Sequence, residues 1–325
     1  MNQNTKLPIR SQFPAASQLI YGCMGLGGGW NNNSITRSDV RQTVEIIDTA
    51  LENNINIFDH ADMYTFGKAE QVFGQALKQQ PALRESMFIQ SKCGIRLADA
   101  NGPKRYDFSS NWIIHSVNNS LKQLNIEYLD MLLLHRPDPL MVIEETADTL
   151  NNLAKAGKVR HFGVSNMHQG QIRLLQSQLN KPIVVNQIEM SLAHHDWLDN
   201  GITSGGKNTK VNGFDTGLLE FSQLHSIQLQ AWGSLAQGSV VHCSKPVAQH
   251  HRLLVDQVKT LAAEYQTSSE AIALAWLMRM PMGIQPIIGT TKISRIKDCC
   301  KAQSITLSRE HWYQLYEAAR GAEIP

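Results

Sequence analysis

The sequence predicts a single α/β domain, residues 1–325, that folds as a (β/α)8 TIM barrel. Eight short apolar runs recur along the chain, and segments with helical periodicity separate them. The runs lack a strict alternation of apolar and polar residues, as expected for strands of a parallel sheet that helices cover. No linker rich in Pro or Ser divides the chain. Eight such units in one uninterrupted chain fit a closed barrel better than a doubly wound sheet.

The apolar runs place the strands in order along the chain. They predict strands at residues 19–21, 55–58, 87–90, 129–134, 159–164, 183–187, 228–232 and 285–288. Helical segments between them include residues 38–54, 110–125, 142–157 and 268–279. Ser38 followed by Asp39 predicts the start of the first of these helices, and Gly157 predicts the end of the third.

One long polar, glycine-bearing stretch, residues 199–217, lies between the sixth and seventh predicted strands. In a barrel it would be a long βα loop over the mouth. Two interpretations stay open, because such a loop is either a lid over the substrate or an insertion without a role.

Composition and charge exclude several classes of function. Apolar residues make up 42% of the chain and charged residues 18%, which is typical of a globular protein. The net charge is +2 and no run of Lys or Arg stands out, so a nucleic-acid partner is not expected. The first twenty residues lack the apolar stretch of a signal peptide, and no window suits a membrane-spanning helix. We therefore expect a cytoplasmic protein with no membrane partner.

The five cysteines predict neither a disulfide framework nor a zinc site, because they form an odd set without a C-x-x-C pair. We expect buried or incidental thiols at Cys23, Cys93, Cys243, Cys299 and Cys300.

Polar residues interrupt the pattern at the ends of several predicted strands, where the active site of a (β/α)8 barrel collects. Asp59 and Tyr64 follow the second strand. Lys92 follows the third strand and His135 follows the fourth. Taken singly, Asp59 could cap a turn, Lys92 could be a surface ion and His135 could be a core histidine. Later strands also end in polar residues, namely Ser165, Asn166 and Gln187.

Together the first four residues predict a proton-donating device in one pocket. Lys92 beside Tyr64 would favour the phenolate and lower the pKa of the phenol from about 10 toward 7. Such a shift needs about 4 kcal/mol of differential stabilisation of the phenolate. Asp59 would keep Lys92 charged and in place. The tuned Tyr64 could then protonate an alkoxide that develops on a carbonyl substrate. Since no Ser, Cys or metal constellation offers a nucleophile, we expect a hydride from a bound cofactor.

Two glycine-bearing segments bear on that cofactor. The cluster at residues 21–30 lacks the G-x-G-x-x-G spacing and an immediate helix, so it does not predict a Rossmann domain. Near the last strand, Gly289, Thr290 and Thr291 precede a helix, and Lys292 and Arg295 add positive charge. This segment predicts a phosphate site, with an ordinary turn bearing surface bases as the alternative.

These residues closely resemble the aldo-keto reductase superfamily, and the resemblance runs from about Leu19 to Ala319. A strand that ends in Asp59 and is followed five residues later by Tyr64 matches the family pattern. Lys92 in SKCG and His135 in LLLHRPD complete the four-residue set in family order.

The resemblance implies an NADPH-dependent oxidoreductase that reduces aldehydes or ketones to alcohols by hydride transfer from the nicotinamide. Tyr64 would be the general acid, Lys92 and Asp59 would tune it, and His135 would orient the carbonyl. Ser165, Asn166 and Gln187 match the residues that hold the nicotinamide carboxamide, and Trp232 matches the ring stacked on it. Gly22, Cys23 and Met24 match a strand-end stretch beside the cofactor. The resemblance also places four residues after Trp232 at the cofactor, namely Gly233, Ser234, Leu235 and Gly238.

The adenosine end carries both a match and a departure. Residues 289–298 resemble the family's clamp on the adenosine phosphate, and Thr291, Lys292 and Arg295 would favour NADP over NAD. Gly289, Thr290 and Asp298 belong to the same predicted clamp. Where many members have Asn after an acidic residue, this chain has Cys299 after Asp298. Another departure is that Gly233, Ser234 and Leu235 stand where the family often has Ser-Pro-Leu.

The substrate is expected to be a small carbonyl compound. His135 favours carbonyl chemistry, because relatives that act on carbon-carbon double bonds would have Glu there. An apolar pocket could be lined by aromatic and thioether side chains, or these could be structural: Trp30, Met63, Phe66, Trp112 and Trp197. The alternative function is a cofactor-binding regulatory protein with little turnover that resembles the β subunits of potassium channels.

Overall fold

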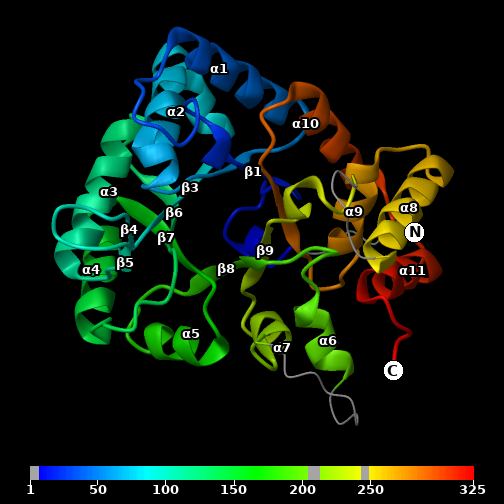
Figure 1. The fold of residues 1–325 in the computed structure, drawn as a ribbon. Helices are drawn as coiled ribbons and strands as arrows, with labels where there is room; N and C mark the ends of the chain where they lie inside the picture. Colours follow the sequence, from blue (N-terminus) through cyan, green and yellow to red (C-terminus); the bar gives the residue numbers. More distant parts are fainter. Residues whose placement is uncertain (1–6, 204–212, 243–248) are drawn as a thin grey trace.

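The chain forms a closed barrel of eight parallel strands (Figure 1), so the predicted (β/α)8 fold is confirmed. The computed structural model describes residues 7–203, 213–242 and 249–325. Around the barrel the strands follow the order β1-β10-β9-β8-β7-β6-β3-β2. Their bounds are β1 (Ile20–Gly22), β2 (Ile57–Asp59), β3 (Phe88–Cys93), β6 (Leu129–Leu134), β7 (Val159–Ser165), β8 (Ile183–Glu189), β9 (Gln228–Trp232) and β10 (Gln285–Ile288).

Helices surround the barrel (Figure 1). They are α1 (Arg37–Glu52), α2 (Lys68–Gln79), α3 (Ser110–Leu124), α4 (Ile143–Lys155), α5 (Gln169–Gln176), α6 (Asp196–Ile202), α7 (Leu218–Leu224), α8 (Gln249–Glu264), α9 (Ser269–Met278), α10 (Ile293–Cys300) and α11 (Arg309–Arg320). Short 3-10 turns are η1 (Pro8–Ser11), η2 (Cys23–Gly25), η3 (Tyr64–Gly67), η4 (Pro81–Ser86), η5 (Ala236–Gly238) and η6 (Lys301–Ser304).

Helix α1 begins earlier than the sequence suggested. Thr36 is its N-cap, and Thr36 and Asp39 exchange hydrogen bonds in a capping box. The prediction of Ser38 as N-cap is therefore wrong, because Asp39 reaches back to the residue three positions before it. The end of α4 is as predicted, since Gly157 follows it with φ +74°.

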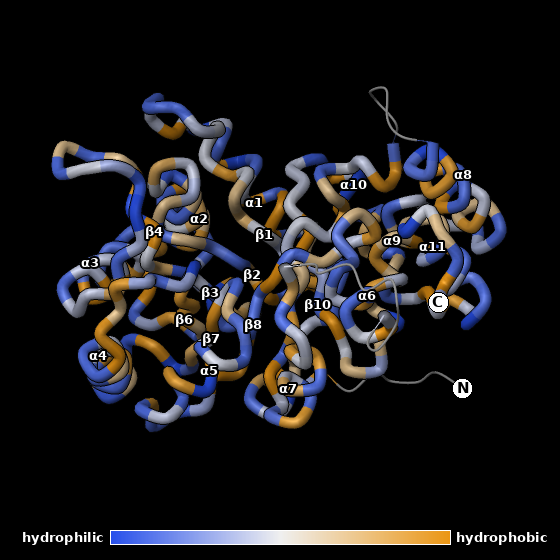
Figure 2. The backbone as a smooth tube through the Cα atoms, turned by 60° about the horizontal axis from the view of Figure 1, so that its bottom comes forward, coloured by the Kyte–Doolittle hydropathy of each residue, from blue (hydrophilic) through white to orange (hydrophobic). Residues whose placement is uncertain are grey.

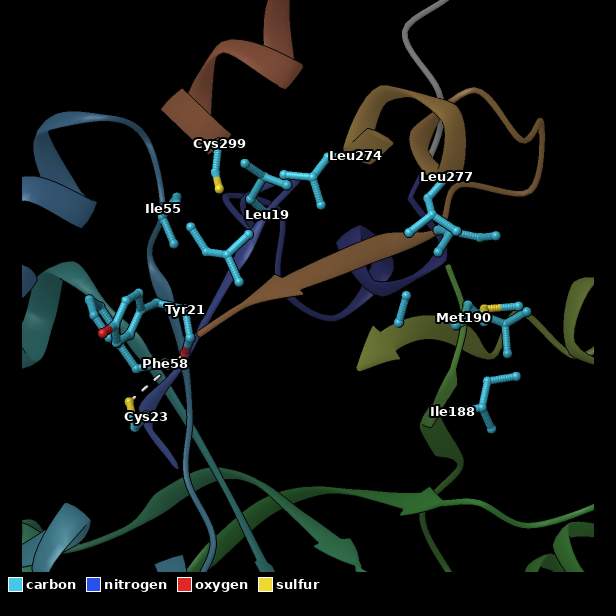
Figure 3. Packing of buried hydrophobic residues seen from close by; sticks show 14 of the residues in the cluster. Leu19, Tyr21, Cys23, Ile55, Phe58, Ile188, Met190, Leu274, Leu277 and Cys299 are labelled. Carbon is cyan, nitrogen blue, oxygen red and sulfur yellow. Dashed lines mark hydrogen bonds between the residues drawn. The ribbon is translucent and has the colours of Figure 1, made fainter. Parts of the chain in front are cut away.

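The main hydrophobic core fills the layer between the strands and the helices. In Figure 2 the backbone of β6 and β7 has the colour of hydrophobic residues, whereas hydrophobic and hydrophilic residues alternate around the helices. Figure 3 shows part of this core, where Phe58 of β2, Leu274 of α9 and Cys299 of α10 approach Leu19 and Tyr21. The cysteines Cys23, Cys93, Cys299 and Cys300 are free and buried, and Cys243 lies outside the described residues.

A second, smaller core fills the lower half of the barrel interior. Ile20, Ile57, Met131, Leu133, Val184, Val185 and Ile287 pack there against a segment that precedes the first strand, through Leu7, Ile9, Phe13 and Ala16. The backbone N–H of Ile9 donates to Gln228 of β9 at 3.4 Å, which ties this segment to the barrel. The N-terminal segment thus closes the end of the barrel where the strands begin.

Two loop regions complete the fold. The glycine cluster before α1 is a loop, in which Gly27 has φ +81° and a Cβ there would lie 2.8 Å from the backbone of Lys68. In the predicted long loop, residues 199–202 belong to α6, and residues 204–212 lie outside the described residues. A small antiparallel hairpin that the sequence did not suggest is formed by β4 (Ile95–Arg96) and β5 (Arg105–Tyr106).

Candidate active site

The upper half of the barrel interior is polar and centres on Lys92. The Lys92 side chain is fully buried, and its Nζ donates to Asp59 Oδ2 at 2.7 Å and to the Tyr64 hydroxyl at 2.9 Å. A third bond at 2.9 Å reaches the backbone oxygen of His60. An ammonium has three protons. Every proton of Lys92 therefore has a partner, and its position is fixed.

A layer of amides supports the carboxylate of Asp59. Asp59 Oδ1 accepts hydrogen bonds from the Nε2 atoms of Gln90 and Gln187, the latter at 3.1 Å. Both amides also donate to Gln230 Oε1, at 2.9 and 3.1 Å. These residues come from β2, β3, β8 and β9, so the network ties opposite sides of the barrel together.

A tight turn after β2 places Tyr64 at the mouth of the barrel. The next two residues, Thr65 and Phe66, have φ of 48° and 61°, and Gly67 has φ 84°. Left-handed conformations are unfavourable for residues with a Cβ, so the turn stores strain next to the site. The Tyr64 hydroxyl accepts from Lys92, which leaves its own proton free to point elsewhere.

Burial controls the titration of this tyrosine. Burial raises the pKa of Tyr64 above its ordinary value, and the nearby Lys92 opposes but does not cancel that rise. The predicted lowering of the Tyr64 pKa toward 7 is therefore wrong, because desolvation of the phenolate outweighs the attraction of the ammonium. For Lys92, burial would lower the pKa, but Asp59 and Tyr64 outweigh it and raise the pKa, as expected for a lysine that stays charged.

His135 follows β6 and lies beside Tyr64, with 5.9 Å between ring centroids. Burial and the charges of Lys92 and Arg136 hold the pKa of His135 well below its usual range. Its imidazole is therefore neutral. Nδ1 of this ring is buried without a hydrogen-bond partner.

The neighbouring strand ends form a hydrogen-bonded chain along one wall. Asn166, with φ 57°, donates from Nδ2 to Ser165 Oγ at 2.6 Å and accepts at Oδ1 from Trp232 Nε1 at 3.1 Å. Ser165 Oγ donates to the backbone oxygen of Gln187 at 2.9 Å. The indole of Trp232 is thereby held at the cavity wall, and the guanidinium of Arg136 lies 5.5 Å from its ring centroid.

These side chains surround a cavity of about 750 Å³ that extends from the barrel mouth to α9 and α10. Such a volume is in the range of small-molecule and cofactor sites. The predicted site residues that line it are Gly22, Met24, Trp30, Asp59, Met63, Tyr64, His135, Ser165, Asn166, Gln187, Trp232, Gly233, Ser234, Leu235, Gly238, Gly289, Thr290 and Arg295. The structure therefore brings most of the predicted residues together around one cavity, and their roles stay predictions.

Several predicted residues lie elsewhere among the described part of the chain. Cys23 points into the main core, where its thiol lies 3.8 Å from the Tyr21 backbone oxygen (Figure 3). Thr291, Lys292 and Asp298 are not part of the cavity wall, and Asp298 pairs with Lys301 at 2.7 Å. Their predicted cofactor contacts stay predictions.

The predicted aromatic pocket is smaller than expected. Trp197 is buried against Trp276 with 5.7 Å between ring centroids, and Trp112 lies 4.1 Å from the Arg96 guanidinium. Phe66 packs against Trp30 on the outside. These three residues do not line the cavity, so of the two alternatives the structural one describes them, as is common for large aromatic side chains.

The cavity also includes residues that the sequence analysis missed. The ionisable ones are Arg136, Glu189, His194, His242, Glu270 and Cys299. Two had a signal in the sequence. Glu189 lies two residues after Gln187 on one strand, so it faces the same side, and Arg136 directly follows His135. Glu270 and Cys299 come from α9 and α10, and strand-end patterns could not indicate them.

Within the described residues, no group of three or more His, Cys, Asp or Glu side chains is arranged to hold a metal ion. None of the helices there combines the length and apolar character needed to cross a bilayer. The cytoplasmic location and the lack of a nucleic-acid partner stay predictions.

Comparison with known proteins gives a consistent family. Residues 18–320 match the model of the aldo/keto reductase family. The oxidoreductase YdhF of Escherichia coli strain K12 is 35% identical over 98% of this chain and 99% of its own. The 6-dehydroglucose reductase of Agrobacterium fabrum is 32% identical, over 95% of this chain and 96% of its own.

A solved structure also shares the architecture. The aldo/keto reductase from Klebsiella pneumoniae, crystallised with NADP and acetate, superposes with a TM-score of 0.69 over 95% of this chain and 93% of that chain. The sequence identity is 22%, so this likeness shows the common fold.

Proposed function

The chain belongs to the aldo/keto reductase family, and from that premise we propose that it reduces the carbonyl group of small aldehydes or ketones with NADPH. One observation carries the proposal. The Lys92 ammonium contacts the Asp59 carboxylate and the Tyr64 hydroxyl together, while Tyr64 faces the cavity beside a neutral His135.

In this proposal Tyr64 supplies the proton. Its hydroxyl accepts from Lys92, so its O–H bond can point to a carbonyl oxygen in the cavity. A raised pKa keeps the phenol protonated at neutral pH, which suits an acid. As the proton moves to the substrate oxygen, the charge that forms on Tyr64 is stabilised by Lys92, and Asp59 keeps Lys92 charged. A neutral His135 can hold the carbonyl by a hydrogen bond.

The cavity fits a nicotinamide dinucleotide. At its inner end Asn166 and Trp232 offer an amide and a flat ring, and at its outer end Arg295 offers a cation. We propose that these groups hold the carboxamide, the nicotinamide ring and the adenosine phosphate, respectively. When bound, NADPH would supply the hydride for the carbonyl carbon. The preference for NADP over NAD rests chiefly on Arg295, with Lys292 and Thr291 nearby in sequence.

The substrate end of the cavity combines apolar and charged groups. Trp30 and Met63 provide an apolar surface, while Arg136, Glu189 and His194 add charge and hydrogen-bonding groups. One relative is named for reduction of a sugar aldehyde, 6-dehydroglucose. We therefore include hydroxylated aldehydes among the substrates to be tested.

The test is NADPH oxidation by the purified protein with aromatic, aliphatic and hydroxylated aldehydes, quinones and small ketones. We expect turnover, and Tyr64→Phe should lower kcat by about 10²- to 10⁴-fold while it keeps NADPH affinity. NADH in place of NADPH should bind more weakly. Tight NADPH binding with no turnover of any carbonyl would contradict the reductase and support the cofactor-binding regulatory alternative.

A further inference from the structure

Behind Lys92, on the outer face of β2 and β3, lies a second polar cluster that the proposed reaction does not use. We call it the acid pair layer, and it consists of His60, Asp62, Glu70, Ser91, Ser116 and Ser120. It lies among β2, β3, α2 and α3, and α2 and α3 are neighbours on this side of the barrel (Figure 1). Glu70 and His60 are fully buried, and Asp62 is half-buried with Oδ1 turned inward.

Most polar atoms of this layer have no hydrogen-bond partner. Both ring nitrogens of His60, Asp62 Oδ1 and Glu70 Oε2 are buried and unpaired. The bond that is formed runs from Ser91 Oγ to Glu70 Oε1, at 2.6 Å. The hydroxyls of Ser116 and Ser120 face Asp62 and Glu70, respectively, and the Ser116 hydroxyl makes no hydrogen bond of normal geometry. Unpaired buried polar atoms are costly and call for an explanation.

The layer is joined directly to Lys92. The backbone oxygen of His60 accepts from Lys92 Nζ, and Ser91 precedes Lys92 on β3. The charge of Lys92 also acts on His60, Asp62 and Glu70. The other cation at the start of α2, Lys68, is bonded to Asn31 at 2.9 Å instead. Further ionisable groups around the layer are the thiols of Cys23 on η2 and Cys93 on β3.

The two carboxyl groups cannot both be charged at low cost. Burial raises the pKa of Asp62 to about 7, and burial together with the charge of Asp62 raises the pKa of Glu70 to about 7. Like charges in a desolvated site favour a state in which one proton is retained. Asp62 reaches the surface, which gives the pair access to solvent protons.

We propose that Asp62 and Glu70 hold one proton between them and that the charge of this pair, acting through Lys92, sets the pH at which Tyr64 gives up its proton. Both are positioning residues, because neither lines the cavity among the described residues. The role in catalysis rests on the proposed function, whereas the shared proton does not.

The sign of the effect follows from charge. When the pair loses its proton, the added negative charge offsets part of the field of Lys92, so the phenolate of Tyr64 becomes harder to form. Because Glu70→Gln removes that negative charge, Tyr64 should ionise at a lower pH in this variant than in the wild type.

The first experiment is the pH profile of alcohol oxidation with NADP, in which Tyr64 acts as the base. Glu70→Gln should move the midpoint to lower pH by about half to one unit, and Asp62→Asn should move it in the same direction. Glu70→Asp keeps a carboxyl group, so it should move the midpoint less than Glu70→Gln does. The exposed Glu85→Gln is the matched control and should leave the profile unchanged. A midpoint that does not move in folded Glu70→Gln would overturn the proposed tuning.

A second measurement does not depend on catalysis. Infrared difference spectra between about pH 6 and pH 8 span the pKa of about 7. The wild type should lose carbonyl-band intensity from the Asp62 and Glu70 carboxyl groups across this range, and Glu70→Gln should lose clearly less, because only Asp62 still titrates there. If the band changes equally in Glu70→Gln, or does not change in the wild type, the shared proton is wrong. This readout decides the point even if the protein reduces no carbonyl.

Discussion

The two faces of β2 and β3 differ in how their buried ionisable groups are paired. On the inner face, Asp59 and Lys92 are bonded to each other, and Gln90 and Gln187 satisfy the remaining carboxylate oxygen. On the outer face, His60 directly after β2 and Glu70 of α2 are equally buried, but their polar atoms are largely unpaired. The inner charges are therefore fixed, whereas the outer carboxyl group of Glu70 can gain or lose its charge near pH 7.

The largest expected effect tests the inner face. Asp59→Asn leaves the Lys92 ammonium buried without its counter-charge, and this should lower the free energy of unfolding by about 3 to 5 kcal/mol. Urea denaturation at pH 7 measures this loss, with Glu85→Gln as the surface control. A loss below about 1 kcal/mol would mean that water or a rearranged partner stabilises Lys92.

The next effect has the opposite sign and tests the outer face. Because the pKa of Glu70 rises from 4.5 to about 7 in the fold, its charged form is disfavoured there, and the cost grows as the pH rises between these values. Glu70→Gln should therefore be more stable than the wild type above pH 7, by at most about 3 kcal/mol, and gain nothing near pH 4. Denaturation curves of both proteins at pH 4, 6 and 8 check this. Equal differences at every pH would contradict it.

The smallest effect concerns His60, whose pKa burial lowers from 6.5 to about 3. The unfolded chain binds this proton as the pH falls below 6.5, whereas the folded chain does not, so acid weakens the fold. His60→Gln removes that proton and should gain about 2 kcal/mol relative to the wild type between pH 6.5 and pH 5. Thermal unfolding over this range tests it. Above pH 7.5 the difference between the two proteins should stay constant.

The barrel was predictable from the sequence because its strands are short apolar runs that repeat with helical segments. All eight strands fall where the runs lie, but several extend beyond the predicted ends. The third strand was expected at residues 87–90, and β3 continues to Cys93. Polar Ser91 and Lys92 looked like the start of a loop, because the pattern could not show that both faces of the strand hold paired or buried polar groups.

The candidate site was predictable where it consists of strand ends. The positions of Tyr64, Lys92 and His135 at strand ends were enough to predict them. The residues at the outer end of the cavity could not be predicted in this way. Glu270 and Cys299 reach it from α9 and α10, whose helical packing sets which side chains face inward. The acid pair layer was also missed, since Glu70 lies in an ordinary amphipathic helix and its burial depends on α3.

The N-terminal segment that packs into the bottom of the barrel has a consequence for how such a protein can change. Leu7, Ile9 and Phe13 contribute to stability at the end of the barrel remote from the cavity, and they come from outside the repeated βα units. The loops at the mouth therefore contribute less to the stability of the closed barrel. We expect those loops to tolerate grafting and replacement, so that new specificities could be selected on this scaffold while the sealed end preserves its fold.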